Sequence, residues 1–434
     1  MATGKKFHIH TFGCQMNVHD SEKIAGLLTA QGHAEADSYE DADVIVFNTC
    51  SIRQKAEQKF MSELGRLKAM KKQRPGLKVV AAGCIAQQMG DALFTRVAGV
   101  VDYVLGPQNI HALPGLLNSA AGMAIEDNPD IALMELPAMR KDRARAWVSI
   151  MYGCNNFCTY CIVPYTRGRE RSRPSTSIIA EIARLGHDGC REVTLLGQNV
   201  NSYTSDLDFP GLLAAIDGVG GIERVRFVTS HPRDLSDALI DAIAGLPKVC
   251  EHLHLPMQSG STRVLGLMHR GYAAEQYLDK IERLRARVPG IAITTDVIAG
   301  FPTETDADHE DTMRMLRTVR FDGIFAFKYS PRPGTKAATM DGQIDESVSG
   351  ARLNEILTLQ DAITLEINQP HVGATLEVLV EGQSETNPEM LTGRTRTNKV
   401  VNFPGEASMI DRLVTVEIVR ARRHSMDGRV LTLL

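Results

Sequence analysis

The sequence predicts an α/β protein in three parts: an N-terminal doubly wound parallel sheet, a central partial (βα)6 barrel and a small C-terminal antiparallel β-barrel. Three observations predict this architecture. Strand-like and helix-like segments alternate in residues 1–120, they alternate again in residues 141–369, and β-rich runs replace them in residues 370–434. Residues 118–140 show no clear strand, and 121–140 are predicted to form a linker.

The N-terminal part repeats one pattern three times, in which an apolar run ends in a cysteine and a helix-like segment follows. The runs are FHIHTFGCQ, DVIVFNTCS and KVVAAGCIA, and a fourth run, VVDYVLGPQ, has Gly106 in place of the cysteine. Residues 53–73, between the second and third runs, have the apolar spacing of a helix. The carboxyl ends of parallel strands meet at one edge of a sheet, so Cys14, Cys50 and Cys84 are predicted to converge there.

The central part contains six strand candidates: AWVSIMYG, EVTLLGQNV, RVRFVTSH, HLHLPMQS, AITTDVIAGF and GIFAFKYS. Helix-like segments such as 175–189 and 273–288 separate them. Six βα units predict an incomplete relative of the eight-fold barrel, with functional residues at the carboxyl ends of its strands.

The tail after Pro370 is β-rich and is broken by Gly, Asn and Pro, in the runs ATLEVLVEG, LTGRTRTNKVVNF, RLVTVEIVRARRH and RVLTLL. It is comparable to the small barrels that bind oligonucleotides. Its eight basic and eight acidic residues cancel, so charge alone does not indicate nucleic-acid binding.

Composition narrows the class of protein. The net charge is −4, neither a secretory signal nor a membrane-spanning run is visible, and the chain is therefore expected to be cytoplasmic. Because a reducing compartment disfavours disulfides, clustered cysteines among the eight point to metal binding or catalysis. Cys190 and Cys250 have no such cluster and are interpreted as ordinary thiols.

Cys154, Cys158 and Cys161 follow the first barrel strand with C-x3-C-x2-C spacing. Zinc usually takes four ligands, and no second pair follows at the usual spacing. Three thiolates suit a [4Fe–4S] cluster whose fourth iron stays open. An open iron can chelate S-adenosylmethionine, and one electron from the cluster then generates a 5′-deoxyadenosyl radical.

This spacing and its place after the first strand resemble the radical S-adenosylmethionine superfamily. With Cys14, Cys50 and Cys84 added, the resemblance narrows to the methylthiotransferase family and covers nearly the whole chain. The motifs that carry it are TFGCQMN, NTCSIR, AAGCIAQQ, CTYCIVPYTRGRERSR, LLGQNVNSY, LPMQSGS and YSPRPGT.

The resemblance implies a methylthiotransferase N-terminal domain (1–120), a radical core (141–369) and an RNA-binding TRAM domain (370–434). It implies two [4Fe–4S] clusters, one on Cys14, Cys50 and Cys84 and one on the catalytic Cys154, Cys158 and Cys161. S-adenosylmethionine is the second cofactor. The implied reaction methylthiolates C2 of N6-dimethylallyladenosine at position 37 of tRNA by radical hydrogen abstraction, sulfur insertion and S-methylation. Implied partners are tRNA and a reducing electron-donor protein, and the chain is expected to be a monomer.

Three alternatives stay open. Relatives in the family modify an aspartate of a ribosomal protein, or threonylcarbamoyladenosine in tRNA. GQNVNSY and YTRGRERSR favour the prenylated adenosine in our interpretation. An alternative of another class is a non-catalytic iron–sulfur sensor that binds RNA.

Five further residues are candidate cofactor ligands by their positions. Tyr160 precedes the third cysteine, and in this superfamily the residue often packs beside the adenine; simple loop packing is the alternative. Gln198 and Asn199 end the second strand where many members carry Gly-Gly-Glu, so a glutamate contact does not carry over. Gln258 and Ser261 end the fourth strand, where polar capping is the alternative, and Gly300-Phe301-Pro302 either approaches the adenine or forms a turn.

Arg167, Arg169, Arg171 and Arg173 alternate beyond the cysteine loop. In an extended segment their side chains would share one face, and residues 140–173 hold eight basic and two acidic residues. The segment is therefore a candidate tRNA-binding element, with a solvated loop of ion pairs as the alternative.

Overall fold

The computed structural model describes residues 4–51, 54–385 and 387–433. The chain divides into two compact units. The N-terminal unit comprises Met1–Lys141, Met151–Phe157 and Cys161–Arg173, and the C-terminal unit comprises Asp142–Ile150, Cys158–Tyr160 and Pro174–Leu434.

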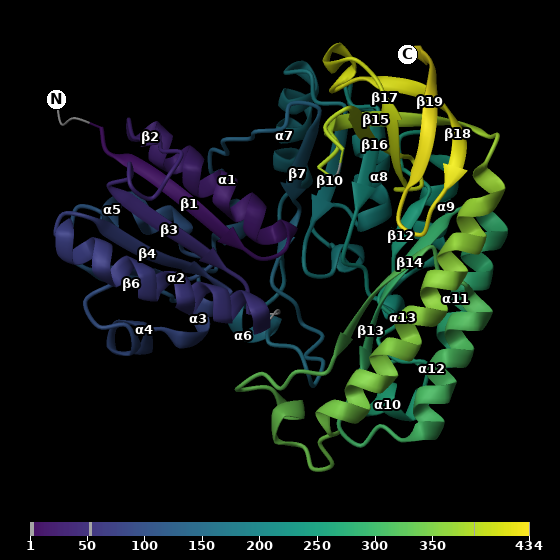
Figure 1. Ribbon diagram of the computed structural model, residues 1–434, viewed down its shortest axis with the longest axis horizontal. Coiled ribbons are helices and arrows are strands. Elements are labelled where there is room, and N and C mark those ends of the chain that lie inside the picture. The colour runs from purple at the N-terminus through teal and green to yellow at the C-terminus, as the bar shows by residue number, and fades with distance from the viewer. Residues whose placement is uncertain (1–3, 52–53, 386, 434) are drawn as a thin grey trace. The chain divides into compact units, whose positions relative to one another are not determined.

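A six-stranded sheet forms the N-terminal unit, with strand order β2-β1-β3-β4-β5-β6 and every pair parallel (Figure 1). This confirms the predicted parallel sheet. Its strands are β1 (Lys6–Phe12), β2 (Ala34–Glu35), β3 (Val44–Thr49), β4 (Lys78–Gly83), β5 (Tyr103–Leu105) and β6 (Gly122–Ala124).

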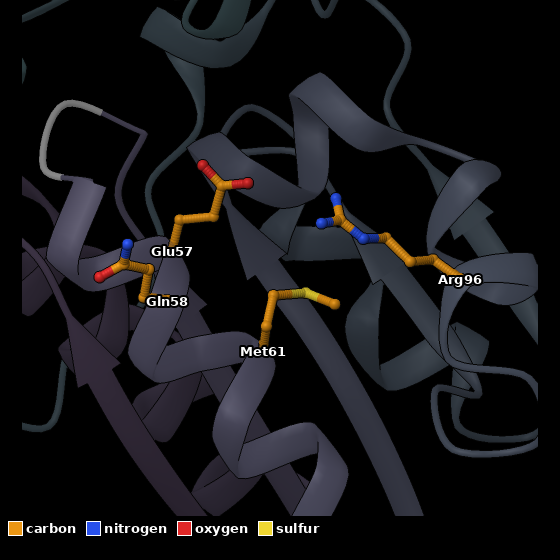
Figure 2. A pocket seen from close by; sticks show the side chains of 4 residues that line it. All are labelled: Glu57, Gln58, Met61 and Arg96. Carbon is orange, nitrogen blue, oxygen red and sulfur yellow. The ribbon is translucent and has the colours of Figure 1, made fainter. Parts of the chain in front are cut away.

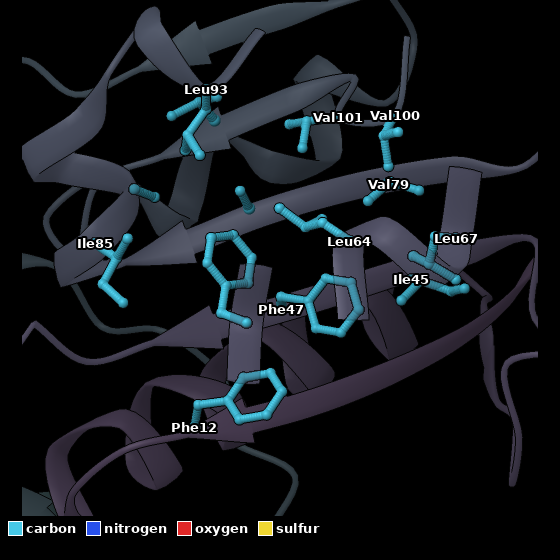
Figure 3. Close-up of a cluster of buried hydrophobic side chains, with 14 of the residues drawn as sticks. Phe12, Ile45, Phe47, Leu64, Leu67, Val79, Ile85, Leu93, Val100 and Val101 are labelled. Carbon is cyan, nitrogen blue, oxygen red and sulfur yellow. The ribbon is translucent and has the colours of Figure 1, made fainter. Parts of the chain in front are cut away.

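Helices cover both faces of this sheet, so it is doubly wound as predicted. On one face, Ile24 and Leu28 of α1 (Gln15–Ala30) pack with Val44 and Val46. On the other face, Leu64 and Leu67 of α2 (Gln54–Gln73) pack with Ile45 and Phe47, as Figure 3 shows, and Phe60 belongs to the same cluster. Alternate residues of β3 thus pack into the hydrophobic cores on opposite faces of the sheet, because successive side chains of a strand point to opposite sides. The expected helix start at Arg53 lies outside the described residues.

Two features of this unit differ from the sequence prediction. Residues 118–140 are predicted to contain no strand, and this is wrong because β6 pairs in parallel with β5. Its sequence, Gly-Met-Ala, lacks the apolar alternation of a strand, so pairing with β5 alone defines it. The short strand β8 (Met151–Tyr152) also pairs with β9 (Arg171–Ser172). The remaining helices are α3 (Cys84–Met89), α4 (Ala92–Arg96), α5 (Leu113–Leu116) and α6 (Val163–Thr166).

Six parallel strands form the predicted partial barrel of the C-terminal unit. They lie in two sheets, β11-β10-β7 and β12-β13-β14, and a parallel bridge from Val225 to Val249 connects β11 to the segment before β12. The strands are β7 (Arg145–Ser149), β10 (Glu192–Leu196), β11 (Arg224–Phe227), β12 (His252–His254), β13 (Ala292–Ala299) and β14 (Gly323–Lys328). The helices are α7 (Ser175–His187), α8 (Phe209–Asp217), α9 (Asp237–Gly245), α10 (Thr262–Leu267), α11 (Ala274–Arg287), α12 (Asp306–Val319) and α13 (Glu346–Asn368).

The C-terminal β-module closes in the order β15-β16-β17-β19-β18. One pair, β17 with β19, is parallel, and the other four pairs are antiparallel as predicted. Val380, Phe403 and Val416 fill its interior. Its strands are β15 (Thr375–Gln383), β16 (Met390–Thr395), β17 (Val400–Pro404), β18 (Leu413–Ala421) and β19 (Met426–Leu433). Among the described helices of the whole chain, none is both long and apolar enough to cross a bilayer.

Candidate functional site

Cys14, Cys50 and Cys84 lie at the carboxyl ends of three neighbouring strands, as predicted. In the β1-β3-β4 register, Phe12 pairs with Thr49 and Thr49 pairs with Gly83. Cys50 and Cys84 follow directly, and Cys14 follows two residues after Phe12 as the N-cap of α1. The hydrogen bond with Cys50, helped by the charge of Arg167, lowers the pKa of Cys14 to about 6 despite burial. This edge of the sheet therefore presents thiols that can bind iron as thiolates.

Backbone and amide groups hold this edge in a fixed shape. The Asn17 amide donates to the Thr49 carbonyl (3.1 Å), and the Asn48 amide donates to the Asn17 carbonyl (2.8 Å). A Cβ on Gly13 would lie 2.8 Å from the Cys50 Cβ. Gly83 has φ +92°, and a Cβ there would lie 2.4 Å from the Thr49 carbonyl oxygen. Only glycine fits either position, so the two glycines allow the chain segments that carry the thiols to pack closely.

Arg167 is buried beside these cysteines within the N-terminal unit. Its Nη2 donates to Asp20 Oδ2 at 2.7 Å, and the Gln108 amide donates to its carbonyl oxygen. Burial raises the pKa of Cys84, while the charge of Arg167 acts in the opposite direction. Arg167 is thus a cation placed to stabilise thiolates.

The second cysteine set lies in the loop after β8. Cys154 donates its N–H to the Gly168 carbonyl (3.1 Å), and its Sγ accepts from the Asn156 N–H (3.5 Å). Gly153 has φ +72°, and a Cβ there would lie 2.0 Å from the Arg169 carbonyl oxygen. This close approach explains the glycine directly before the first cysteine.

Cys158 belongs to the C-terminal unit, where Arg270 Nη1 donates to its Sγ at 3.3 Å. The next residue is anchored to the end of α10, because Thr159 donates its N–H to the Met268 carbonyl and its hydroxyl to the Leu267 carbonyl. Tyr160 packs against the cluster of Val264, Met268, Phe301 and Ala337.

No disulfide links any of the eight cysteines in the described structure. Among the described residues, no three His, Cys, Asp or Glu side chains converge as the ligands of a single metal ion do. A cubane cluster does not require such convergence, since its thiolates bind different iron atoms.

Unsatisfied polar atoms gather where β10 and β11 end. Both amide atoms of Gln198, Oδ1 of Asn199, Oγ of Ser230 and Nε2 of His231 are buried and lack a hydrogen-bond partner in the described structure. Asn199 is oriented by its Nδ2, which donates to Asp234 Oδ2 at 2.7 Å. Burial, with the nearby charges of Arg270, Arg233 and Lys280, lowers the pKa of His231 to about 2, so its ring is neutral. Buried polar atoms normally have partners, so these fit a polar ligand such as S-adenosylmethionine.

Comparisons with known proteins agree with this geometry. Residues 6–106 match the model of Uncharacterized protein family UPF0004, residues 148–316 match the Radical SAM superfamily, and residues 369–431 match the TRAM domain. The chain is 50% identical to a tRNA-2-methylthio-N(6)-dimethylallyladenosine synthase of Thermodesulfovibrio yellowstonii, over 99% of both chains. It is 48% identical to the synthase of that name from Acetivibrio thermocellus, over 99% of this chain and 92% of the relative.

The chain belongs to the radical S-adenosylmethionine methylthiotransferase family.

Solved structures of more distant proteins share the fold. The radical S-adenosylmethionine methyltransferase TsrM from Kitasatospora setae, with cobalamin and a [4Fe–4S] cluster bound, matches with TM-score 0.57 at 12% identity, covering 90% of this chain and 80% of that chain. The cobalamin-dependent enzyme OxsB matches with TM-score 0.53 at 11% identity, covering 82% of this chain and 56% of that chain. Members of the methylthiotransferase family carry two [4Fe–4S] clusters and use S-adenosylmethionine.

Of the residues predicted to bind the cofactor, Ser261 has a structural role in the described fold. Its hydroxyl donates to Asp308 Oδ1 (2.6 Å) and accepts from the Val264 N–H, so it caps α10. The capping alternative therefore describes Ser261 better. Gln258 has φ +70° and forms an isolated parallel bridge with Val297, beyond β12, which ends at His254.

The expectation that four alternating arginines share one face is wrong. Arg167 terminates the helix α6 and is 5% exposed, so the segment is not extended there, and Arg173 is also 5% exposed. Arg169 is exposed and stacks on the Phe157 ring at 4.3 Å, and Arg171 pairs with Asp127 at 2.6 Å. Only Arg169 and Arg171 keep a position suited to phosphate contact.

Of the two arginines that lie against cysteines, sequence reasoning assigned Arg167 to tRNA binding and missed Arg270. Arg167 stands in a basic run and resembles a surface residue, while Arg270 follows a short helix without any motif. It also missed His231, although its place at the end of β11 is where the barrel presents ligands.

The pocket in Figure 2 is lined by none of the residues that were predicted to bind a cofactor. It has a volume of about 420 Å³ and is lined by Glu57, Gln58, Met61 and Arg96 of α2 and α4. None of these four side chains was expected to bind a cofactor, and the pocket is not part of the site described above.

Proposed function

We propose that the chain is a tRNA methylthiotransferase that converts N6-dimethylallyladenosine at position 37 of tRNA to its 2-methylthio derivative. The observation that carries this is end-to-end identity of 50% with a relative named for that product. The two cysteine sets at strand ends supply the thiolates that the chemistry requires.

The cysteines divide between two roles in this proposal. Cys154, Cys158 and Cys161 hold the cluster that reacts with S-adenosylmethionine, and Cys14, Cys50 and Cys84 hold the cluster that delivers sulfur. When bound, one molecule of S-adenosylmethionine would supply the radical that removes the C2 hydrogen, the cluster on Cys14, Cys50 and Cys84 the sulfur that replaces it, and a second molecule of S-adenosylmethionine the methyl group. The C2–H bond is strong and non-acidic, so a side-chain base alone could not activate it.

Protein groups around the cofactor bind and orient it. Gln198 and Asn199 offer unsatisfied amide atoms to its polar end, and Tyr160 and the backbone of Gly300-Phe301-Pro302 are proposed to lie beside its adenine. Nδ1 of the neutral His231 accepts from the Arg233 N–H, so its unpartnered Nε2 can donate one hydrogen bond without adding charge. Gln258 stays a proposed contact by its place in the segment that follows β12.

Arg169 and Arg171 together with the TRAM domain (370–434) are proposed to contact tRNA. The proposal keeps the radical core at 141–369, but the bounds of 1–120 for the N-terminal domain and 121–140 for the linker are corrected, because β6 (Gly122–Ala124) belongs to the N-terminal sheet. The chemistry requires one electron, which a reducing donor protein is proposed to supply, and the enzyme is proposed to act in the cytoplasm as a monomer.

An anaerobic assay tests the function. Reconstituted protein, reductant and S-adenosylmethionine are mixed with tRNA that contains prenylated and threonylcarbamoylated adenosine, and the digested nucleosides are analysed by mass spectrometry. We expect a methylthio group on the prenylated nucleoside alone. Modification of the other nucleoside, or deoxyadenosine without any modified nucleoside, would contradict the substrate assignment and point to ribosomal protein in the second case. Intact clusters that form no deoxyadenosine would support the sensor alternative.

A further inference from the structure

Arg270 is a buried arginine whose polar contacts centre on Cys158. It is 5% exposed, and its Nη1 lies 3.3 Å from Cys158 Sγ and 3.4 Å from the Tyr160 hydroxyl. Its Nη2 donates to the Pro256 carbonyl at 3.0 Å, and its Nε donates to the Tyr272 hydroxyl at 3.2 Å. All these residues belong to the C-terminal unit.

The charge of Arg270 lacks a carboxylate partner in the described part of the chain. Its polar neighbours are a carbonyl, two phenols and one thiol. The Tyr272 hydroxyl lies within 3.3 Å of two carbonyl oxygens, which fixes the side chain against which Arg270 rests. A guanidinium keeps its charge at any physiological pH, and burying an unpaired charge is costly.

Three other buried arginines illustrate the usual pairing with a carboxylate. Arg167 pairs with Asp20 at 2.7 Å, Arg352 pairs with Glu304 at 2.8 Å and Arg226 pairs with Glu192 at 2.9 Å. Arg270 therefore needs an anion from outside the protein's carboxylates, and its guanidinium is already in contact with a predicted cluster ligand.

We propose that Arg270 is a positioning residue that supplies the buried positive counter-charge of the cluster on Cys154, Cys158 and Cys161 and thereby raises its reduction potential. This inference rests on the proposed function, because it takes these three cysteines as the ligands. Thiolate ligation makes the cluster anionic, and reduction adds one more negative charge. A fixed cation in a low-dielectric site stabilises the reduced form more than the oxidised form.

The test uses a full-length Cys14→Ala/Cys50→Ala/Cys84→Ala background, in which the cluster of interest is alone. Iron and sulfide content are measured after anaerobic reconstitution, and the reduction potential is measured by a titration followed by electron paramagnetic resonance. Arg270→Lys keeps the charge, and Arg270→Gln removes it. Arg263→Gln is the matched control, because Arg263 is half-exposed and already paired with Asp308 at 2.5 Å.

We expect Arg270→Gln to shift the reduction equilibrium at least tenfold toward the oxidised cluster, which is about 59 mV more negative for one electron. The reduction potential of the Arg270→Lys protein should stay near that of the background protein, and Arg263→Gln should leave the potential unchanged. Loss of iron from Arg270→Gln but not from Arg270→Lys would also support the counter-charge. An unchanged potential in a loaded Arg270→Gln protein would overturn the inference while the function stands.

Two further outcomes are distinguishable. A background protein that binds no more iron than its Cys154→Ala derivative would overturn the cluster assignment itself, and the inference with it. If both Arg270 variants unfold by circular dichroism, Tyr272→Phe replaces them, since it removes one partner of the guanidinium. A negative shift there would support the inference, and an unchanged potential would overturn it.

Discussion

The Arg167 guanidinium donates a 2.7 Å hydrogen bond to the Asp20 carboxylate, and both side chains are almost fully buried in the N-terminal unit. The pair joins the segment after the second cysteine loop to α1, next to Cys14 and Cys84. It combines a cation near the thiols with a carboxylate that balances it.

Asp20→Asn should destabilise the N-terminal unit by about 3–5 kcal/mol, because it leaves the buried Arg167 charge unpaired. Denaturant unfolding of the cluster-free protein measures this. Asp127→Asn is the matched control: Asp127 is 62% exposed and pairs with Arg171, so its loss should cost less than about 1 kcal/mol. Equal effects of the two variants would contradict the assigned role of the buried pair.

The two cysteine sets should separate two partial reactions. Cys158→Ala should abolish deoxyadenosine formation, whereas Cys84→Ala should retain it and lose methylthio insertion. Chromatography of both products under reducing, anaerobic conditions measures this. Cys190→Ala is the control, since Cys190 is a buried thiol that donates to backbone carbonyls, and it should retain both reactions. Full methylthio product from Cys84→Ala would refute the sulfur-delivery role.

His231 should make stability depend on pH. Its folded pKa of about 2 lies below the unfolded value of 6.5, so the unfolded chain binds more protons between these values. The stabilisation that comes from keeping His231 neutral is fully present above pH 6.5. Below pH 6.5 the free energy of unfolding falls by up to about 1.4 kcal/mol per pH unit. The charges facing the ring, Arg270, Arg233 and Lys280, all favour its neutral form.

His231→Asn should therefore reduce the loss of stability between pH 6.5 and pH 5, measured by urea unfolding at each pH. His187→Asn is the control, because the His187 side chain is 89% exposed. A pH profile of His231→Asn identical to that of the unchanged protein would contradict the prediction.

Arg226 should hold the C-terminal β-module to the partial barrel. It donates to the carbonyls of Thr395 (2.7 Å) and Arg396 (2.8 Å) and pairs with the buried Glu192. Arg226→Met should cost about 3–5 kcal/mol, because Glu192 loses its nearest cation. Limited proteolysis near residue 370 should accelerate, whereas Arg429→Gln, which removes an exposed ion pair with Glu417, should leave it unchanged.

Arg169 should contribute one phosphate contact to tRNA binding. Arg169→Gln should weaken binding and reduce the dependence of log K on log salt by about one. Fluorescence anisotropy at several salt concentrations measures this slope. Arg287→Gln, at an exposed residue of α11 paired with Asp241, is the control, and an equal change in both variants would contradict a specific contact.

Much of the fold follows from local patterns in the sequence. The alternation in DVIVFNTCS and KVVAAGCIA predicts strands, and the cysteine that ends each run fixes its place at the sheet edge. The C-x3-C-x2-C spacing likewise indicates the chemistry, because ligand type and spacing are local properties. The strand of Gly122–Ala124 is not predicted, since only pairing with β5 defines it.

The sequence by itself determined the three-part architecture, the two cysteine sets and the family. Tertiary structure decided which charges are buried and what they contact. Arg167 and Arg169 are two residues apart and look alike in sequence, yet one pairs with Asp20 inside the N-terminal unit and the other is exposed on Phe157. Arg270 contacts Cys158 across 112 residues of sequence. Such contacts depend on packing between distant segments, and no local pattern encodes them.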